Sequence, residues 1–458
     1  MRTPGAGTAL AVVAAMITGC AYYNGLYNAN RLMNAAEKAE REGRESEARA
    51  LWSRAAVKAE SVVARYPGSK YRDDALFVWG GALQSAGECD RAIAPLTLAL
   101  ASSPDTAIRR RSRQLLGRCY YESGEFQAAD SILTPFADSQ DSSVAVPALL
   151  WRGRARLATG DYGEAVRDLA ACGLPQAQFP LALAYAYLHQ PLAAQRVLLA
   201  AHEGPLQEGQ WLSVLDTVGG LYPDVAGVVV DHLAERGSIS VDGRAVLLLR
   251  DGERLLVGGR AGEAAARFRQ VVALAPSARV TAIAQVRLVQ AELRLATEVA
   301  QAPVMLRRLR SVGLEEEDSR RLRYQELSSD LEMAVAGLAP PLSEGEPVSV
   351  VGGGPDLDLF MAAEVLRQDW FAIPLAVALL CELPRRFPRS AIAPKALLAA
   401  AWLDATQSDS LLTVLHRDYP RSPYTLVLSG AAGDDYTALE DSLRALLKAR
   451  RRPTSNRR

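Results

Sequence analysis

The chain has 458 residues, of which 49% are apolar and 23% are charged, and its 52 basic side chains balance its 52 acidic ones. Alanine and leucine dominate and aromatic residues are scarce, which is typical of a soluble helical protein and leaves no global field to attract nucleic acid. This length can bury a large core, although an array of repeats grows by adding neighbours without splitting into globular domains.

The first residues predict export and attachment to a membrane. Met1-Arg2 supplies a positive charge, and Ala9 to Ile17 is an apolar run too short to span a bilayer, so residues 1–19 predict a secretory signal peptide. The run ends in Ile17-Thr18-Gly19-Cys20, which resembles the lipobox of bacterial lipoproteins. The resemblance implies that Cys20 is acylated and becomes the mature N-terminus. An ordinary signal peptide with a chance cysteine is the alternative.

The residue after the cysteine predicts the destination. In lipoproteins, Ala21 rather than Asp at this position implies sorting to the outer membrane of a two-membrane bacterium, with the chain facing the periplasm. Several acyl chains at one site give lasting attachment, since each buried methylene contributes ~0.8 kcal/mol. We therefore expect an anchored protein with no spanning helix. Residues 20–29 predict a short tether that keeps the first helix near the membrane.

The helical pattern starts directly after this tether. Asn30 to Arg41 and Glu45 to Arg65 predict a helix pair joined at Gly43, which caps the array that follows. The stretch from Asp73 to Pro104 then has the spacing of a helix–turn–helix unit. Gly80 and Ala92 lie where the two helices cross, and Gly87 lies at the turn between them. Pro104 lies beyond the second helix.

The same frame returns three times. Its copies contain Gly117, Tyr120, Gly124, Ala129 and Leu133; then Gly153, Gly160, Ala165 and Leu169; then Gly252, Leu255, Gly259, Ala264, Phe268 and Pro276. These copies resemble the tetratricopeptide repeat (TPR), although Arg152, Arg156 and Asp251 lie where apolar residues are usual. The resemblance implies an all-α, TPR-like solenoid of stacked antiparallel helix hairpins. We expect it to cover residues 30–339, with degenerate repeats from Leu174 to Gly243 in which even Val228-Val229-Val230 is helical.

The later part of the chain predicts a second, shorter helical section. Arg279 to Ala300 and Glu315 to Gly337 predict two long helices, and the Pro- and Gly-rich residues 340–356 predict a linker. Residues 357–447 again show helical spacing, with two related turns at Phe387-Pro388-Arg389-Ser390 and Tyr419-Pro420-Arg421-Ser422. Residues 448–458 are basic and lack an apolar pattern, so we expect a disordered tail.

Neither the histidines nor the cysteines predict catalysis. His189, His202, His232 and His416 do not form a metal-binding or triad-like pattern, and no glycine run matches a phosphate loop, so we expect no enzyme activity, cofactor, metal or small-molecule substrate. Besides Cys20, the cysteines are Cys89, Cys119, Cys172 and Cys381. Cys89 and Cys119 lie in successive repeats. Their spacing agrees with a disulfide between them, and equally with two separate thiols that fill small packing sites.

The TPR resemblance also implies a binding surface. In such arrays the first helix of each repeat lines a concave groove. Its register carried onto this chain selects Asp74, Phe77 and Gln84, then Arg111, Gln114, Arg118 and Tyr121, then Leu150, Arg154 and Leu157. Arg111, Arg118 and Arg154 predict a basic ladder suited to an extended peptide with carboxylates. Ordinary surface arginines are the alternative, because Arg109 and Arg110 show that basic residues here are not confined to one face.

The lead hypothesis is a lipid-anchored periplasmic scaffold that holds envelope proteins at the outer membrane. A lipobox followed by helical repeats and the junction Tyr66-Pro67-Gly68-Ser69-Lys70-Tyr71 resembles the BamD-like lipoproteins of the outer-membrane β-barrel assembly machinery, and the periplasmic TPR coordinators of envelope constriction. That resemblance covers mainly Cys20 and residues 55–170, and it implies partners from barrel assembly. The alternatives are attachment of a secretion or motility complex, and a cell-wall enzyme or activator with its function after Gly354.

Overall fold

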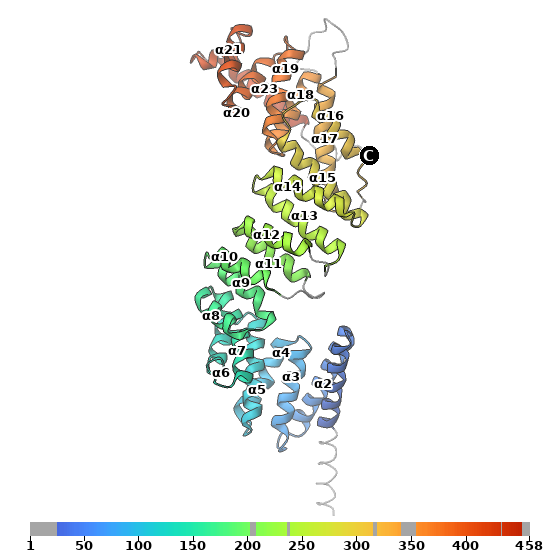
Figure 1. The fold of residues 1–458 in the computed structure, drawn as a ribbon, viewed down its shortest axis with the longest axis vertical. Coiled ribbons are helices and arrows are strands. Elements are labelled where there is room, and N and C mark those ends of the chain that lie inside the picture. Colours follow the sequence, from blue (N-terminus) through green and yellow to red (C-terminus); the bar gives the residue numbers. More distant parts are fainter. Residues whose placement is uncertain are drawn as a thin grey trace, which may run out of the picture. The chain divides into compact units, whose positions relative to one another are not determined.

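The computed structural model describes residues 25–201, 208–235, 239–314, 318–339, 354–431 and 433–450. Every regular element in these ranges is a helix, and the chain divides into two compact units, Met1–Val225 and Ala226–Arg458 (Figure 1). Successive helices pack against each other in both units, so the prediction of an all-α solenoid of antiparallel hairpins is confirmed. Cys20 and the rest of the predicted lipobox lie outside the described residues.

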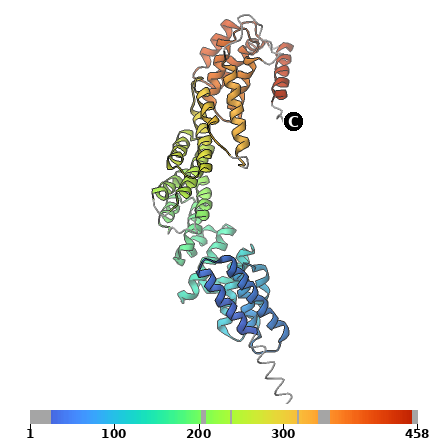
Figure 2. The same cartoon turned by 90° about the vertical axis from the view of Figure 1, so that its right-hand side faces the viewer.

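The first unit begins with a helix over residues 25–41 and continues as a row of helix hairpins (Figure 2). Its further helices are α2 (Glu45–Arg65), α3 (Arg72–Ser85), α4 (Cys89–Ser102), α5 (Thr106–Glu122), α6 (Phe126–Ala137), α7 (Ser142–Thr159), α8 (Tyr162–Cys172), the short η1 (Pro175–Ala177), α9 (Gln178–Tyr187), α10 (Pro191–Leu199) and α11 (Glu208–Leu221).

The described helical residues extend into the segment that the sequence predicts as a tether. Residues 25–29 are already helical, because Leu26 and Ala29 pack against the second helix of the pair and the helix after it. Ala29 is fully buried beside Ala59 and Val78. The stretch between Cys20 and the helical array is therefore shorter than the predicted ten residues.

Each full repeat closes through one glycine and one large side chain. A Cβ added to Gly80 would lie 2.4 Å from Leu96 Cγ, and one added to Gly117 would lie 2.4 Å from Leu133 Cγ. Gly153 meets Leu169 and Gly252 meets Phe268 in the same way. The four frames found in the sequence are thus four equivalent helix crossings, at which the missing side chain lets the helices approach.

The turns between the helices follow the same logic. Gly87 joins α3 to α4 with φ +82°, and Gly160 ends α7 with φ +87°. Residues with a Cβ rarely adopt this left-handed conformation, so glycine permits the tight turn that folds each helix back on its predecessor.

Most helices of the second unit also pack on the next helix of the chain. Helix α12 (Pro223–Glu235) spans the division between the two units, and it makes Val228–Val230 helical as predicted. The helices after it are α13 (Val241–Val257), α14 (Ala261–Leu274), α15 (Ala278–Leu295), α16 (Gln301–Arg310), α17 (Arg321–Gly337), α18 (Pro355–Gln368), α19 (Ile373–Arg386), α20 (Ala393–Leu403), α21 (Ser408–Asp418), α22 (Pro423–Leu428) and α23 (Asp434–Arg450).

Three features of this unit differ from the sequence-based expectations. The helix predicted over 279–300 ends at Leu295, because Ala296 is extended, and a separate helix, α16, follows. Helix α18 starts at Pro355 and packs on α17, where Gly337 contacts Leu359, so the helices on both sides of the predicted linker share one core. The division into units falls at Val225 instead. Residues 340–353 lie outside the described ranges.

The C-terminal helix also reaches further than expected. Helix α23 continues to Arg450, and therefore includes the first three residues of the predicted tail, Lys448 to Arg450, which are all good helix formers. Residues 451–458 lie outside the described ranges. Among the helices that the structure describes, none combines the length and the apolar character needed to cross a membrane.

Candidate partner-binding groove

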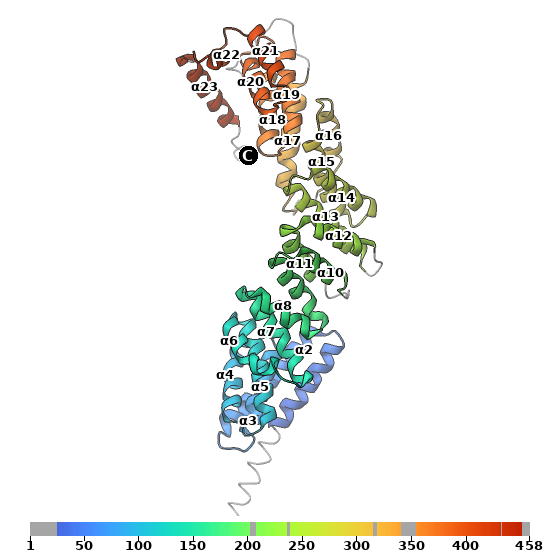
Figure 3. The same cartoon turned by 60° about the vertical axis from the view of Figure 1, so that its left-hand side comes forward.

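The first helices of successive hairpins form one continuous surface in the first unit. Helices α3, α5 and α7 contact one another in order, and each also packs on its own second helix (Figure 3). This is the surface that the repeat register predicts to bind a partner. The predicted residues lie on these three helices.

Trp151 on α7 is the centre of a cluster on this surface, and the sequence analysis did not select it. The guanidinium of Arg118 lies 5.1 Å from the centroid of its ring and that of Arg154 lies 4.7 Å from it. The ring of Tyr121 packs against the same indole at a tilted angle, with 5.4 Å between centroids. Two helices thus place two cations and one aromatic ring around a half-buried tryptophan.

Polar contacts fix the two arginines of this Trp151 cluster. Arg118 Nε donates to Glu122 on the same helix over 2.6 Å. Its guanidinium also faces Gln84, whose amide oxygen accepts over 3.1 Å when the amide is oriented toward it. Arg154 Nη2 donates to the carbonyl of Gln176 over 3.0 Å, and burial lowers its pKa. These hydrogen bonds orient both guanidinium groups beside the indole.

The structure thus brings four of the predicted groove residues together, namely Gln84, Arg118, Tyr121 and Arg154. It does not place Phe77 with them: that ring packs against the buried residues of the first hairpins. Arg111 is exposed and Gln114 is half-buried on α5. Leu150, which the same register selected, is buried in the core.

The predicted basic ladder is reduced by these contacts. Arg118 is paired with Glu122 although 42% of its side chain is exposed, and Arg154 is half-buried. Arg111 is the most exposed of the three predicted ladder residues. The geometry suits a partner that places an apolar or aromatic side chain against Trp151 and a carboxylate near Arg111. A hydrophobic anchor in this cluster was missed because α7 turns the position after Leu150, rather than Leu150 itself, toward the surface.

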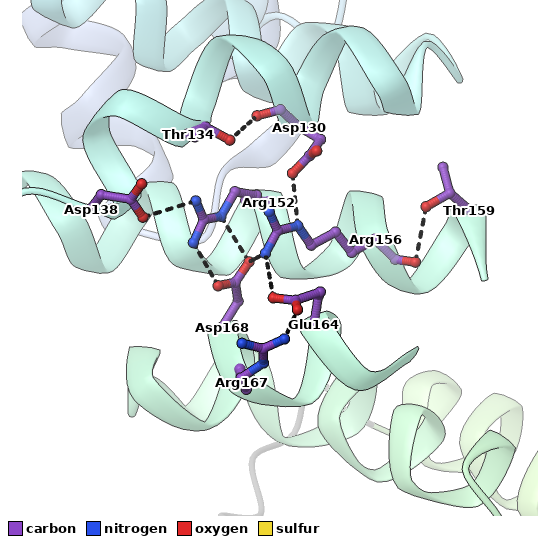
Figure 4. Close-up of polar contacts among 9 residues, drawn as sticks. All are labelled: Asp130, Thr134, Asp138, Arg152, Arg156, Thr159, Glu164, Arg167 and Asp168. Atoms are coloured by element: carbon purple, nitrogen blue, oxygen red, sulfur yellow. Dashed lines mark hydrogen bonds and ion pairs between the residues drawn. The ribbon is translucent and has the colours of Figure 1, made fainter. Parts of the chain in front are cut away.

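A buried ionic network underlies the cluster. Arg152, next to Trp151, forms two hydrogen bonds with Asp168 on α8, over 2.8 and 2.7 Å, and a third with Asp138 over 3.1 Å (Figure 4). Arg156 joins Asp168 to Asp130 on α6, over 3.0 and 2.8 Å. The network connects three helices of two successive hairpins, and so fixes the helix that carries Trp151.

A disulfide links the hairpin of α3 and α4 to that of α5 and α6. Cys89, the first residue of α4, is bonded to Cys119 on α5, with 4.8 Å between the Cα atoms. Both cysteines are buried, and Cys119 directly follows Arg118. Of the two accounts that the sequence left open, the structure therefore has the disulfide. Cys172 and Cys381 are free thiols, and burial raises the pKa of each.

The remaining residue types do not assemble a second kind of site in the described part of the chain. No group of three or more histidine, cysteine, aspartate or glutamate side chains there has the arrangement of a metal site. His189 Nδ1 lies 2.9 Å from the hydroxyl of Tyr222, and His416 Nδ1 lies 2.8 Å from the carbonyl of Leu412.

Comparison with known proteins gives only distant likenesses. No family model matches the chain, and no curated protein matches it in sequence. Among solved structures, a tetratricopeptide repeat protein from Parabacteroides merdae matches at 13% identity and a TM-score of 0.36, covering 57% of this chain and 98% of that one. The TPR domain of P58(IPK) matches at 13% identity and a TM-score of 0.19, covering 83% and 99%. At these scores the fold rests on the helix packing described above.

Proposed function

We propose that this chain is a non-enzymatic scaffold, anchored by lipid to the outer membrane and facing the periplasm, which docks partner proteins on the inner helices of its first unit. The observation that carries the proposal is the Trp151 cluster. Tryptophan, tyrosine and arginine are the residue types that dominate binding energy at protein interfaces. Here Arg118, Tyr121 and Arg154 hold a half-buried indole on an accessible helix face.

The partner segment that fits best is extended and amphipathic. Helices α3, α5 and α7 contact one another in order, and an extended segment bound along them would use Trp151 on α7 and Arg111 on α5. Trp151 offers an apolar face, and Arg111 offers an exposed charge for a carboxylate. Outer-membrane protein assembly is the process that the sequence resemblance favours.

Two features support the compartment. The Cys89–Cys119 disulfide suits an oxidising environment such as the bacterial periplasm, because thiols in the cytosol are kept reduced. The sequence Ile17-Thr18-Gly19-Cys20 supports lipid attachment. Both features point to an exported protein independently of each other.

The docking surface is tested by site-specific photocrosslinking in the native membrane. A photoreactive residue at Arg111 or Gln114 should crosslink to a partner, whereas one at the exposed Gln127 on α6 serves as the matched control outside the groove. Trp151→Ala should reduce the crosslink at least tenfold, since loss of a hot-spot residue costs about 2 kcal/mol or more. Trp151→Phe, which keeps an aromatic face for the arginines, should retain most of it.

Two results would contradict docking at this surface. One is equal crosslinking from Gln127 and Arg111; the other is an unchanged crosslink in a Trp151→Ala protein. The thermal unfolding midpoint of each variant is measured in parallel, because Trp151 also packs on the core around Leu133 and Ala148.

The anchor is tested separately. Cys20→Ser should leave the protein in the soluble fraction after a carbonate wash, while the wild-type chain stays with the membranes. Pelleting of the serine variant with the membranes would refute attachment at Cys20. A purified chain that turned over peptidoglycan, and lost this activity when the part after Gly354 was removed, would favour the cell-wall enzyme instead.

A further inference from the structure

Two matching turns of the second unit, one after α19 and one after α21, lie side by side. In Phe387–Ser390 the last N–H donates to the first carbonyl over 3.0 Å, and in Tyr419–Ser422 it does so over 3.1 Å. Both segments are therefore β-turns, with proline in the second position and arginine in the third. The hydroxyl of Tyr419 donates to the carbonyl of Pro388 over 3.0 Å, which joins the second turn to the first.

Each turn is also bonded to a neighbouring helix. Ser390 is buried, and its Oγ donates to Asp356 on α18 over 2.7 Å. On α22, Thr425 Oγ1 donates to the carbonyl of Tyr419 over 2.7 Å. These contacts fix the backbone positions from which the two arginines extend.

The turns do not require the arginines in order to form. In the first unit, Tyr66–Ser69 makes the same hydrogen bond over 3.1 Å with Gly68 in the third position. The corresponding side chains of the second unit, Arg389 and Arg421, are both exposed. Local folding therefore does not explain why both turns carry an arginine here.

Both turns border one open hollow of about 590 Å³. Its walls are mainly apolar and consist largely of rings, from Pro388, Pro394, Tyr419, Pro420 and Pro423, together with Leu439 of α23. Arg389 and Arg421 line the hollow as well. Asp418 also borders it, and this carboxylate pairs with Arg417 over 2.7 Å. The hollow thus combines an apolar surface with two positive charges.

This combination fits an amphipathic ligand. The volume lies in the range of ligand sites, roughly 300–1,000 Å³. The apolar walls do not suit a simple inorganic anion, which needs polar partners on several sides. An extended peptide offers both kinds of group, since an apolar side chain can pack on the rings and carboxylates can accept from the guanidinium groups. An anionic membrane surface is flat and presents headgroups first, so it fits a concave apolar hollow less well.

We propose that this hollow binds an extended peptide segment of a partner protein, in which carboxylates flank an apolar side chain. The apolar side chain packs on the prolines and Tyr419, and the carboxylates accept from Arg389 and Arg421. The site lies within the second unit and shares no residue with the Trp151 cluster. Docking at one surface can therefore fail in an experiment without affecting the other.

The test uses the full chain purified in detergent and a library of random heptapeptides displayed on phage. Peptides retained by the wild-type chain, and not by the double variant Arg389→Gln, Arg421→Gln, should share an apolar residue with Asp or Glu on both sides. A synthetic peptide of the most enriched sequence should bind the double variant at least about fivefold more weakly, because it loses two exposed ion pairs. Replacing the carboxylates of the peptide by amides should weaken its binding to the wild-type chain to a similar extent.

Two single variants separate the hollow from a general effect of charge. Ala391 is exposed and lines the hollow, so Ala391→Trp should fill it and abolish peptide binding while both arginines remain. Arg385→Gln removes an exposed charge that pairs with Glu382 and does not line the hollow, and this variant should bind as wild type does. The thermal unfolding midpoint of each variant shows whether it is folded.

Four results would overturn the proposal. The first is that no acidic and apolar sequence is enriched, and the second is that the double variant binds the peptide as tightly as wild type. The third is loss of binding in Trp151→Ala, which would place the peptide in the first unit. The fourth is displacement of the peptide by dihexanoyl phosphatidylglycerol, a water-soluble anionic lipid, at a lower concentration than by the unlabelled peptide itself, which would assign the hollow to lipid.

Discussion

Arg152 and Asp168 form a buried ion pair between the two helices of one repeat. Asp251 and Arg267 occupy the equivalent positions in a later repeat, so the charges of that pair are exchanged. Each pair spans 16 residues and bonds Nε to a carboxylate oxygen over 2.8 Å. Each pair also lies one residue before a glycine crossing, Gly153–Leu169 or Gly252–Phe268. In both cases the arginine also reaches a carboxylate outside its own hairpin: Asp138, at the end of α6, for Arg152, and Asp231, on α12, for Arg267.

This relationship predicts strong coupling between Arg152 and Asp168. Burial alone would lower the pKa of Arg152, but the hydrogen bond and attraction to Asp168 outweigh it and raise that pKa. Asp168→Ala leaves two enclosed guanidinium groups, those of Arg152 and Arg156, and should lower the free energy of unfolding by about 3–5 kcal/mol. Chemical denaturation measures this loss.

The matched control is a double variant in which the apolar pair of the preceding repeat replaces the ion pair. Leu116 and Ile132 occupy the equivalent positions there and pack in the core. The double variant Arg152→Leu with Asp168→Ile should therefore lose clearly less stability than Asp168→Ala alone. A loss in the double variant equal to or larger than that of the single one would contradict the coupling.

The sequence predicted the crossings and misjudged what replaces apolar residues at them. Gly80, Gly117, Gly153 and Gly252 are recognisable because glycine has one role at a close helix approach. Arg152 and Asp251 only looked like departures from the repeat, because their partners lie 16 residues away on a second helix and a pairing across helices cannot be found by spacing alone. Their opposite signs hid the equivalence further.

The candidate groove shows the same limit. The repeat register selected Arg118, Tyr121 and Arg154, and these three side chains meet in space around Trp151. It missed Trp151 because it placed the neighbouring Leu150 in the groove, whereas the structure buries Leu150 and leaves Trp151 half-buried. Sequence spacing likewise left Cys89 and Cys119 undecided, because a disulfide depends on the distance between Cα atoms and not on separation along the chain.

Gly117→Ala should destabilise the third hairpin. The added methyl group would meet three atoms of Leu133, the nearest at 2.4 Å, and these belong to a fully buried side chain that cannot move away freely. We expect a loss of about 1–3 kcal/mol in the free energy of unfolding. Gly163→Ala on α8 is the control, because nothing lies within 4 Å of its added Cβ. Equal stability of the two variants would mean that the crossing is not tight.

Ala129→Trp tests the same hairpin from its second helix. Ala129 is fully buried on α6, where the sequence placed a small residue of the repeat. An indole there overpacks the crossing, so the unfolding midpoint should fall by several degrees. An unchanged midpoint would show that the repeat register is wrong at this position.

Reduction of the Cys89–Cys119 disulfide should lower stability. The bond closes a loop with a sequence separation of 30, and chain entropy then predicts a loss of about 3–4 kcal/mol on reduction. A reductant should lower the unfolding midpoint of the wild-type chain and leave that of a Cys89→Ala, Cys119→Ala variant unchanged. An equal response of both proteins would place the reductant's effect elsewhere.

Asp330 on α17 should make the second unit less stable as the pH rises. Burial raises the pKa of this carboxyl to about 6, against the hydrogen bond from the indole of Trp370, while the negative charges of Asp369 and Glu326 add to the rise and Arg323 opposes it. The folded chain therefore holds the proton more tightly than the unfolded chain, whose carboxyl has a pKa of 3.8. Its contribution to stability is complete below about pH 4 and is lost as the pH passes through 6.

Asp330→Asn isolates this effect because asparagine still accepts from Trp370 and carries no charge. The variant should gain up to roughly 3 kcal/mol over wild type at pH 7.5, and this advantage should vanish near pH 4, where the wild-type carboxyl is protonated. Urea denaturation at both pH values measures the difference. Asp409→Asn, an exposed carboxylate on α21, is the control and should leave the pH dependence unchanged. If Asp330→Asn has the same stability relative to wild type at both pH values, the buried carboxyl does not titrate in this range, and its hydrogen bond with Trp370 must hold it ionised throughout.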